Sequence, residues 1–257
     1  MTINFSQILQ DSWNFMRNQR KFVFTLILFF CLASLIINLL GSSLFQTAIE
    51  TSSTEMGNKN DISIMMQRVQ SDNFLVLYLV NQLITFVLSA WGLFGIHQIS
   101  QGQAVNYTQS TKSTLNGIIG FIMLNIIISL PLAIGLINIL PAIVNSSNTT
   151  GLFGIILVIL GTYIYIRLCL TPIHYLITKV TLLQAIQQIW QMSHKRVAIL
   201  FIYCLLIYFL IPALTQQIAF LATNITIDII ATLLIATISV FVLIISYRFY
   251  ILFNQKA

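Results

Sequence analysis

The chain has 257 residues, of which 58% are hydrophobic and only 7% are charged, and its formal net charge is +6. Soluble domains carry about 25% charged residues, so this composition excludes an ordinary soluble fold and indicates a membrane protein. The positive charge does not indicate a nucleic-acid partner, because the basic residues flank apolar segments instead of gathering on one soluble face.

Residues 1–21 are predicted to form an amphipathic helix on the membrane surface. Asn4, with Gln7 three residues later, is typical of a helix N-terminus. The helix leads into residues 22–40, an uncharged run that covers ~28 Å and can cross the hydrocarbon core. A cleaved signal peptide is the alternative interpretation. We favour a retained span, because the run is longer than a signal core and no small-residue cleavage site follows it.

Residues 41–73 form the one sizeable polar loop of the chain. Apolar side chains recur within it at helical spacing, which predicts a short amphipathic helix: Ile62, Met65, Met66 and Val69. We interpret this segment as a loop helix that rests on the bilayer surface. The alternative is a lid that binds a partner.

Five more apolar segments follow, and each is long enough to cross the hydrocarbon core. The six predicted spans lie at about 22–40, 74–96, 117–144, 151–171, 197–222 and 227–247. Pro131 and Pro141 interrupt the third span and Pro212 interrupts the fifth. We interpret these prolines as kinks; broken helices that form an ion or substrate site are the alternative. The predicted fold is therefore all-α and polytopic, in one membrane domain covering 1–257.

Two further amphipathic segments precede the third and fifth spans. The stronger one covers 181–196, where apolar residues occupy one side from Leu182 to Met192 and only Ser193 breaks that side. The weaker one covers 100–115. The sequence thus predicts that an interfacial helix introduces each of spans one, three and five.

An internal repeat is consistent with this organisation. A shift of 81 residues places Ser100 and Gln103 on Thr181 and Gln184, Pro131 on Pro212, and Arg167 on Arg248. A shift of 177 residues places Asn4, Gln7 and Trp13 on Thr181, Gln184 and Trp190. The hypothesis is a unit of one surface helix and two spans, present three times in the same orientation. Chance matching among abundant Gln, Ile and Leu is the alternative.

The orientation follows from the basic residues on each side of the spans. Ten lie on the side of the N-terminus, whereas only Lys59 and Arg68 lie on the other side. Basic residues concentrate in the cytoplasmic segments of membrane proteins. The sequence therefore predicts that both termini are cytoplasmic.

Four residues are candidates for lipid-headgroup contacts or membrane anchors. Arg167 and Arg248 lie at the inner ends of spans four and six, where a long side chain reaches the interface and fixes the depth of its helix. A specific site for lipid phosphates is the alternative. Trp13 and Trp190 lie on the apolar sides of their surface helices, which suits the interfacial aromatic belt.

The sequence offers no pattern for catalysis, a cofactor or a metal. Its three histidines lack metal-ligand spacing, and no Asp or Glu lies at mid-membrane in a span, since Asp228 sits at the outer edge of span six; this disfavours ion-coupled transport. The three cysteines fall inside apolar runs, and we interpret them as small, buried hydrophobic residues. Polar residues inside the spans are expected to hydrogen-bond between helices, or alternatively to line a small cavity: Asn38, Asn81, Gln82, Asn125 and Asn138.

Both ends of the chain resemble a known family. The opening Gln10-Asp11-Ser12-Trp13-Asn14-Phe15-Met16-Arg17-Asn18-Gln19 resembles the N-terminus of the YciC-type bacterial inner-membrane proteins. The closing Tyr247-Arg248-Phe249-Tyr250-Ile251-Leu252 is similar to the Phe-Arg-Leu-Tyr-Met-Leu ending of that family. The resemblance implies a six-span inner-membrane protein of Gram-negative bacteria with no assigned activity. It supplies no catalytic or binding residues.

Three classes of function remain. We favour a non-enzymatic membrane protein with a structural or accessory role, which acts through membrane lipids or through protein partners that the sequence does not identify. A small-solute transporter or channel is second, and a lipid-modifying enzyme is third. A polar cavity lined by Asn81, Asn125 or Asn138 would favour transport, whereas a packed apolar interior would favour the first class.

Overall fold

The computed structural model describes residues 4–52, 72–144, 152–194, 196–221 and 224–255. Within these residues the chain is helical and contains no strand, which confirms the all-α prediction. The helices are α1 (Phe5–Asn18), α2 (Arg20–Ser52), α4 (Asp72–Ser100), α5 (Tyr107–Val144), α6 (Leu152–Leu168), α7 (Thr171–Thr178), α8 (Leu182–Ser193), α9 (Val197–Cys204), the π-helical segment η1 (Leu205–Leu210), α10 (Ile211–Phe220) and α11 (Ile225–Gln255). The predicted loop helix at 62–69 lies outside the described residues.

Six stretches of the described chain are long and apolar enough to cross a membrane, as predicted: Arg20–Gly41, Val76–Ser100, Tyr107–Ile139, Leu152–Thr178, Val197–Phe220 and Thr226–Gln255. Many large apolar side chains on these helices face outward, and Phe209 and Ile119 are each more than 70% exposed. Apolar surface on this scale is compatible with lipid and not with water. The chain is therefore a multi-pass membrane protein.

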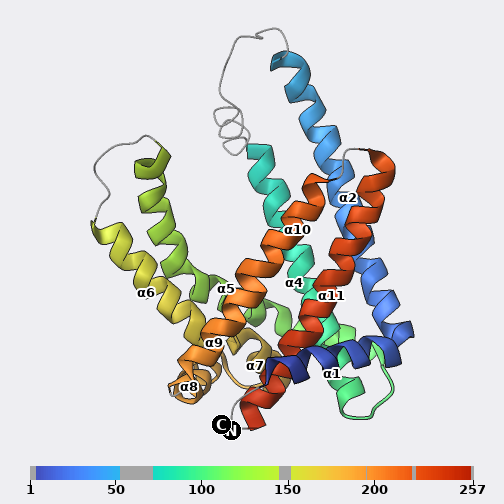
Figure 1. Cartoon of the computed structure of the whole chain (residues 1–257), viewed down its shortest axis with the longest axis vertical. Coiled ribbons are helices and arrows are strands. Elements are labelled where there is room, and N and C mark those ends of the chain that lie inside the picture. The colour runs from blue at the N-terminus through green and yellow to red at the C-terminus, as the bar shows by residue number, and fades with distance from the viewer. Residues whose placement is uncertain (1–3, 53–71, 145–151, 195, 222–223, 256–257) are drawn as a thin grey trace.

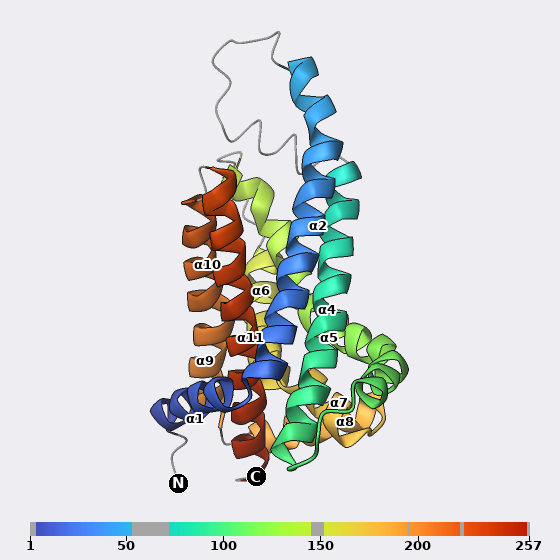
Figure 2. The ribbon, with the colours of Figure 1, turned by 90° about the vertical axis from the view of Figure 1, so that its right-hand side faces the viewer.

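The six spans pack as a ring in chain order. Each span contacts the next one, and α11 closes the ring by packing against α2. Helix α11 also contacts α4 and α1. The α5–α6 hairpin leans away from α10 and α11 toward the top of Figure 1. We call the bottom the basal end; it holds α1, α7, α8, the start of α2 and the end of α11 (Figures 1 and 2).

Two of the predicted amphipathic helices, α1 and α8, lie across the basal end (Figures 1 and 2). Asn4 is the N-cap of α1, because its Oδ1 accepts a hydrogen bond from the Ser6 backbone N–H at 3.1 Å. At the start of α8 the Thr181 backbone N–H donates to Gln184 Oε1 at 3.2 Å. Both helices bury one side against the bundle and expose the other.

The third predicted surface helix, at 100–115, is not a separate element. Ser100 ends α4, residues 101–106 are non-helical, and α5 begins at Tyr107 and continues into the third span. The cap is Asn106, whose Oδ1 accepts from the Gln109 backbone N–H at 3.1 Å. The repeat alignment pairs Ser100 with Thr181, the N-cap of α8, whereas the helix here begins six residues later at Asn106.

The prolines have different local effects. Helix α5 continues through Pro131 and Pro141 without interruption. By contrast, Pro212 follows the π-helical turn η1, which separates α9 from α10. Proline has no N–H to donate and its ring crowds the carbonyl four residues earlier, so a wider π-turn relieves the strain before Pro212.

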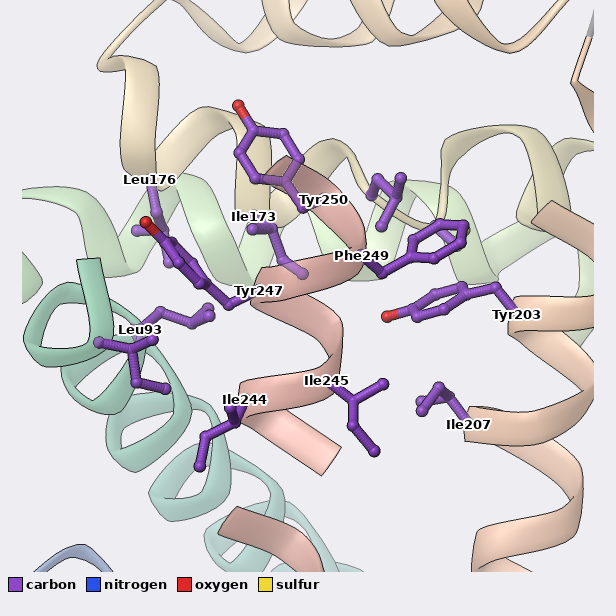
Figure 3. Close-up of a cluster of buried hydrophobic side chains, with 14 of the residues drawn as sticks. Leu93, Ile173, Leu176, Tyr203, Ile207, Ile244, Ile245, Tyr247, Phe249 and Tyr250 are labelled. Carbon is purple, nitrogen blue, oxygen red and sulfur yellow. The ribbon is translucent and has the colours of Figure 1, made fainter. Parts of the chain in front are cut away.

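The packed core is concentrated around the last turns of α11. Five of its largest side chains are almost inaccessible: Tyr203, Tyr247, Phe249, Tyr250 and Phe253. Figure 3 shows Tyr247 and Tyr250 directed to different sides of α11, while Phe249 lies against Tyr203. Helix α11 continues past Tyr247, its predicted end, to Gln255 because these residues pack against the basal helices.

Candidate functional site at the basal end of α11

Four consecutive residues of α11, Tyr247 to Tyr250, point to four sides of the helix, because successive residues are rotated by about 100°. Phe249 stacks on Tyr203 of α9, with ring centroids 4.3 Å apart. On the other side of α11, Tyr247 and Tyr250 reach histidines of α4 and α7. This segment therefore joins helices that are far apart in the sequence.

His97 of α4 has both ring nitrogens in hydrogen bonds. Its Nε2 lies 3.0 Å from Gln101 Nε2, and its Nδ1 lies 3.0 Å from Tyr247 Oη. The amide nitrogen of Gln101 can only donate, so Nε2 accepts and Nδ1 donates to Tyr247. The bond to Gln101 is local to the end of α4, and the bond to Tyr247 joins α4 to α11.

His174 of α7 makes the equivalent link with the opposite tautomer. Its Nε2 lies 2.6 Å from Gln188 Oε1 of α8, and its Nδ1 lies 2.9 Å from Tyr250 Oη. Because the oxygen of Gln188 can only accept, Nε2 donates to it and Nδ1 accepts from Tyr250. His174 is buried and connects three helices. Neither histidine–tyrosine pair could be predicted from the sequence, because the members of each pair lie far apart along the chain.

Arg167 is buried between α6 and α8, with 4% of its surface exposed. Its Nε donates to Ser193 Oγ at 3.0 Å, and its terminal nitrogens donate to the Trp190 carbonyl at 2.6 Å and to Tyr163 Oη at 3.2 Å. The guanidinium carbon also lies 3.7 Å from the centre of the Trp190 ring. These contacts give Arg167 a role that the sequence did not indicate, as the link between α6 and α8. They also explain why Ser193 interrupts the apolar side of α8.

Arg248 has very different surroundings, although the repeat aligns it with Arg167. Its guanidinium carbon lies 5.6 Å from the centre of the Phe15 ring of α1. Its Nε is buried and has no hydrogen-bond partner. The side chain borders a cavity of about 410 Å³ at the basal end, lined by Asp11, Asn14, Phe15, Asn18, Gln19, Ile99, Ser100 and Arg248.

The two candidate tryptophans also differ. Trp13 on α1 is 60% exposed, and its ring meets Phe241 edge-on with centroids 6.4 Å apart. Trp190 on α8 is 38% exposed, because one face of its ring covers Arg167. Trp13 is therefore the more exposed of the two tryptophans.

The polar side chains within the spans mainly serve their own helices. Asn125 Nδ2 donates to the Phe121 carbonyl and Asn138 Nδ2 to the Ile134 carbonyl, each at 2.8 Å. Neither residue borders the 410 Å³ cavity or a second basal cavity of about 230 Å³ beside Lys179. Among the described residues, no group of three or more His, Cys, Asp or Glu side chains is placed to hold a metal ion.

Comparison with known proteins gives one informative similarity. No protein-family model and no solved structure matches the chain. An uncharacterized protein of Haemophilus influenzae is 33% identical over 257 residues, which cover 99% of this chain and 100% of that protein. Identity at this level over both full lengths means that the chain belongs to the same family of proteins as this Haemophilus influenzae protein.

Proposed function

We propose that the chain is a non-enzymatic protein of the bacterial inner membrane that acts through contacts with lipids or proteins at its cytoplasmic face. The observation that carries this proposal is the basal cavity beside Arg248, whose half-buried guanidinium group forms no hydrogen bond or ion pair with the residues that the structure describes. A partly desolvated cation without an acceptor is costly, so a group from outside the chain that bonds its terminal nitrogens stabilises this arrangement.

The basal end is assigned to the cytoplasm because of its basic residues. Arg17, Arg20 and Lys21 lie at the junction of α1 and α2, and Lys112 and Lys179 flank the third and fourth spans at the same end. Basic residues concentrate in cytoplasmic segments, and this orientation matches the family resemblance of the two chain ends to the YciC-type inner-membrane proteins.

A non-enzymatic role is supported by the way the basal histidines are used. His97 and His174 use both ring nitrogens in hydrogen bonds to protein side chains, and neither lines either of the two basal cavities, where a substrate would bind. A transporter or channel ranks second, since Asn125 and Asn138 hydrogen-bond to their own helices instead of lining a polar path.

The test is purification from native membranes in a mild detergent, followed by mass spectrometry of the bound lipids and proteins. We expect stoichiometric lipid, or a stoichiometric protein partner, to remain with the chain. A chain that carries neither, and that moves a solute across vesicles when reconstituted, would replace this proposal with the transport function.

A further inference from the structure

We propose that the basal cavity binds the headgroup of a zwitterionic phospholipid, with the phosphate on Arg248 and the ammonium group on Asp11. This inference rests on the proposed function, since it requires that the chain acts through lipid at this face. It adds the site, the two residues that recognise the ligand and the class of lipid.

The phosphate is assigned to Arg248 because of the geometry of its guanidinium group. The guanidinium group of Arg248, which projects from α11, lies against the Phe15 ring of α1. Its Nε–H is buried out of reach of a ligand, but its terminal nitrogens also form no hydrogen bond with the residues that the structure describes, and the side chain borders a cavity. A guanidinium group presents parallel N–H donors that match the oxygens of a phosphate. Arg167 cannot serve in this way, because its three nitrogens already donate to protein oxygens.

The ammonium group is assigned to Asp11, the one acidic residue in the cavity lining. One carboxylate and one guanidinium make the formal charge of this lining zero. A cavity of that kind repels a second negative charge near Asp11 and attracts a positive one, so it discriminates against purely anionic headgroups. A phosphate ester that carries an ammonium group, as in phosphatidylethanolamine, complements both residues.

The size and the remaining lining suit a headgroup. The volume of about 410 Å³ lies within the range of about 300–1,000 Å³ that is typical of small-ligand sites. Asn14, Asn18 and Gln19 contribute amides and Ser100 a hydroxyl, which can bond ester and phosphate oxygens.

A membrane lipid is favoured over a soluble phosphate ester because of where the cavity lies. It is bordered by α1 and by the basal ends of α4 and α11, at the level where apolar spans give way to polar residues. Trp13 of α1 is 60% exposed, and Phe24 at the start of the first span is 66% exposed. Acyl chains can lie against this apolar surface while the headgroup enters the cavity.

The test measures the lipid retained by the full-length chain after reconstitution into vesicles of equal phosphatidylethanolamine and phosphatidylglycerol, extraction in mild detergent and native mass spectrometry. We expect wild type to retain phosphatidylethanolamine in excess over phosphatidylglycerol. Arg248→Gln should lower the retained phosphatidylethanolamine by about tenfold. Asp11→Asn should keep lipid bound but lower the preference for phosphatidylethanolamine by about fivefold. The matched control is Arg17→Gln, which removes one basal charge outside the cavity and should leave both values unchanged.

The outcomes separate this inference from the proposed function. If wild type retains lipid but Arg248→Gln and Asp11→Asn retain the same lipids in the same ratio, the assigned site is wrong while the proposed function stands. If wild type retains neither lipid nor protein, the proposed function fails as well. If Arg248→Gln does not fold, the headgroup preference of Asp11→Asn still decides the question. A third arm adds soluble O-phosphoethanolamine to the lipid-free protein. Binding of this compound, with no retained lipid, would show that the ligand is a soluble phosphate ester and not a membrane lipid.

Discussion

At the scale of single residues, Arg167 and Arg248 have different roles, although the hypothetical repeat aligns them. Both lie near the basal ends of their helices, α6 and α11. All three nitrogens of Arg167 donate to Ser193, Trp190 and Tyr163, whereas Arg248 beside the cavity forms no hydrogen bond with the described residues. The difference comes from the partner helix, because α8 offers a serine hydroxyl and a carbonyl where α1 offers the Phe15 ring.

Replacing Arg167 by methionine is expected to destabilise the protein by about 2–4 kcal/mol, because two buried acceptors on α8 lose a charged donor. Arg167→Lys should lie between wild type and Arg167→Met, since an ammonium group cannot reproduce the fork of donors. The free energy of unfolding in detergent measures the effect. Arg17→Met is the matched control, because Arg17 is exposed. Equal stability of Arg167→Met and Arg17→Met would contradict the link between α6 and α8.

Tyr250→Phe should cost about 1–2 kcal/mol, because the change leaves the buried Nδ1 of His174 without its donor while keeping the ring in place. The same measurement of unfolding serves here, with Tyr78→Phe as the control because the Tyr78 side chain is 56% exposed. A Tyr250→Phe protein as stable as the control would show that the histidine–tyrosine pair does not hold α7 to α11.

At the scale of elements, sequence periodicity predicted α1 and α8 well, because each helix has one apolar side and a polar cap within one turn. The prediction of a surface helix at 100–115 was wrong. The repeat alignment pairs Ser100 with the N-cap Thr181, but the helix begins after the cap Asn106. The proline positions were visible in the sequence, but their effects were not. Packing decides whether a proline is absorbed within a helix, as in α5, or preceded by a π-turn, as before Pro212.

The cap of α5 gives a direct test at this scale. Asn106→Ala should destabilise the protein by about 1 kcal/mol, because the Gln109 backbone N–H loses its acceptor. Gln103→Ala should have no effect, since Gln103 is exposed and lies outside any helix. Thermal unfolding in detergent distinguishes the two. A larger loss for Gln103→Ala than for Asn106→Ala would contradict the cap at Asn106.

At the scale of the whole molecule, the spans form a ring in chain order, and the three-unit repeat stays a hypothesis. In that hypothesis the second span of each unit packs on the first helix of the next unit: α4 on α5, α6 on α8, and α11 on α1. Composition and hydropathy predicted the number of spans, because the length of an apolar run is a property of the sequence alone. The basal site was only partly predictable. Arg248 was a candidate from the sequence, but its cavity depends on α1 folding back onto α11, a contact between residues more than 200 positions apart in the chain.

The orientation of the basal end is the claim on which the lipid site and the proposed function both depend. In a variant with Cys31, Cys169 and Cys204 replaced by alanine, single cysteines are introduced at Gln187 of α8, which is exposed at the basal end, and at Lys59 of the predicted outer loop. Intact cells are then treated with a membrane-impermeant maleimide. A cytoplasmic basal end predicts labelling of the cysteine at position 59 in intact cells, and labelling at position 187 only after permeabilisation. Labelling at position 187 in intact cells would contradict it.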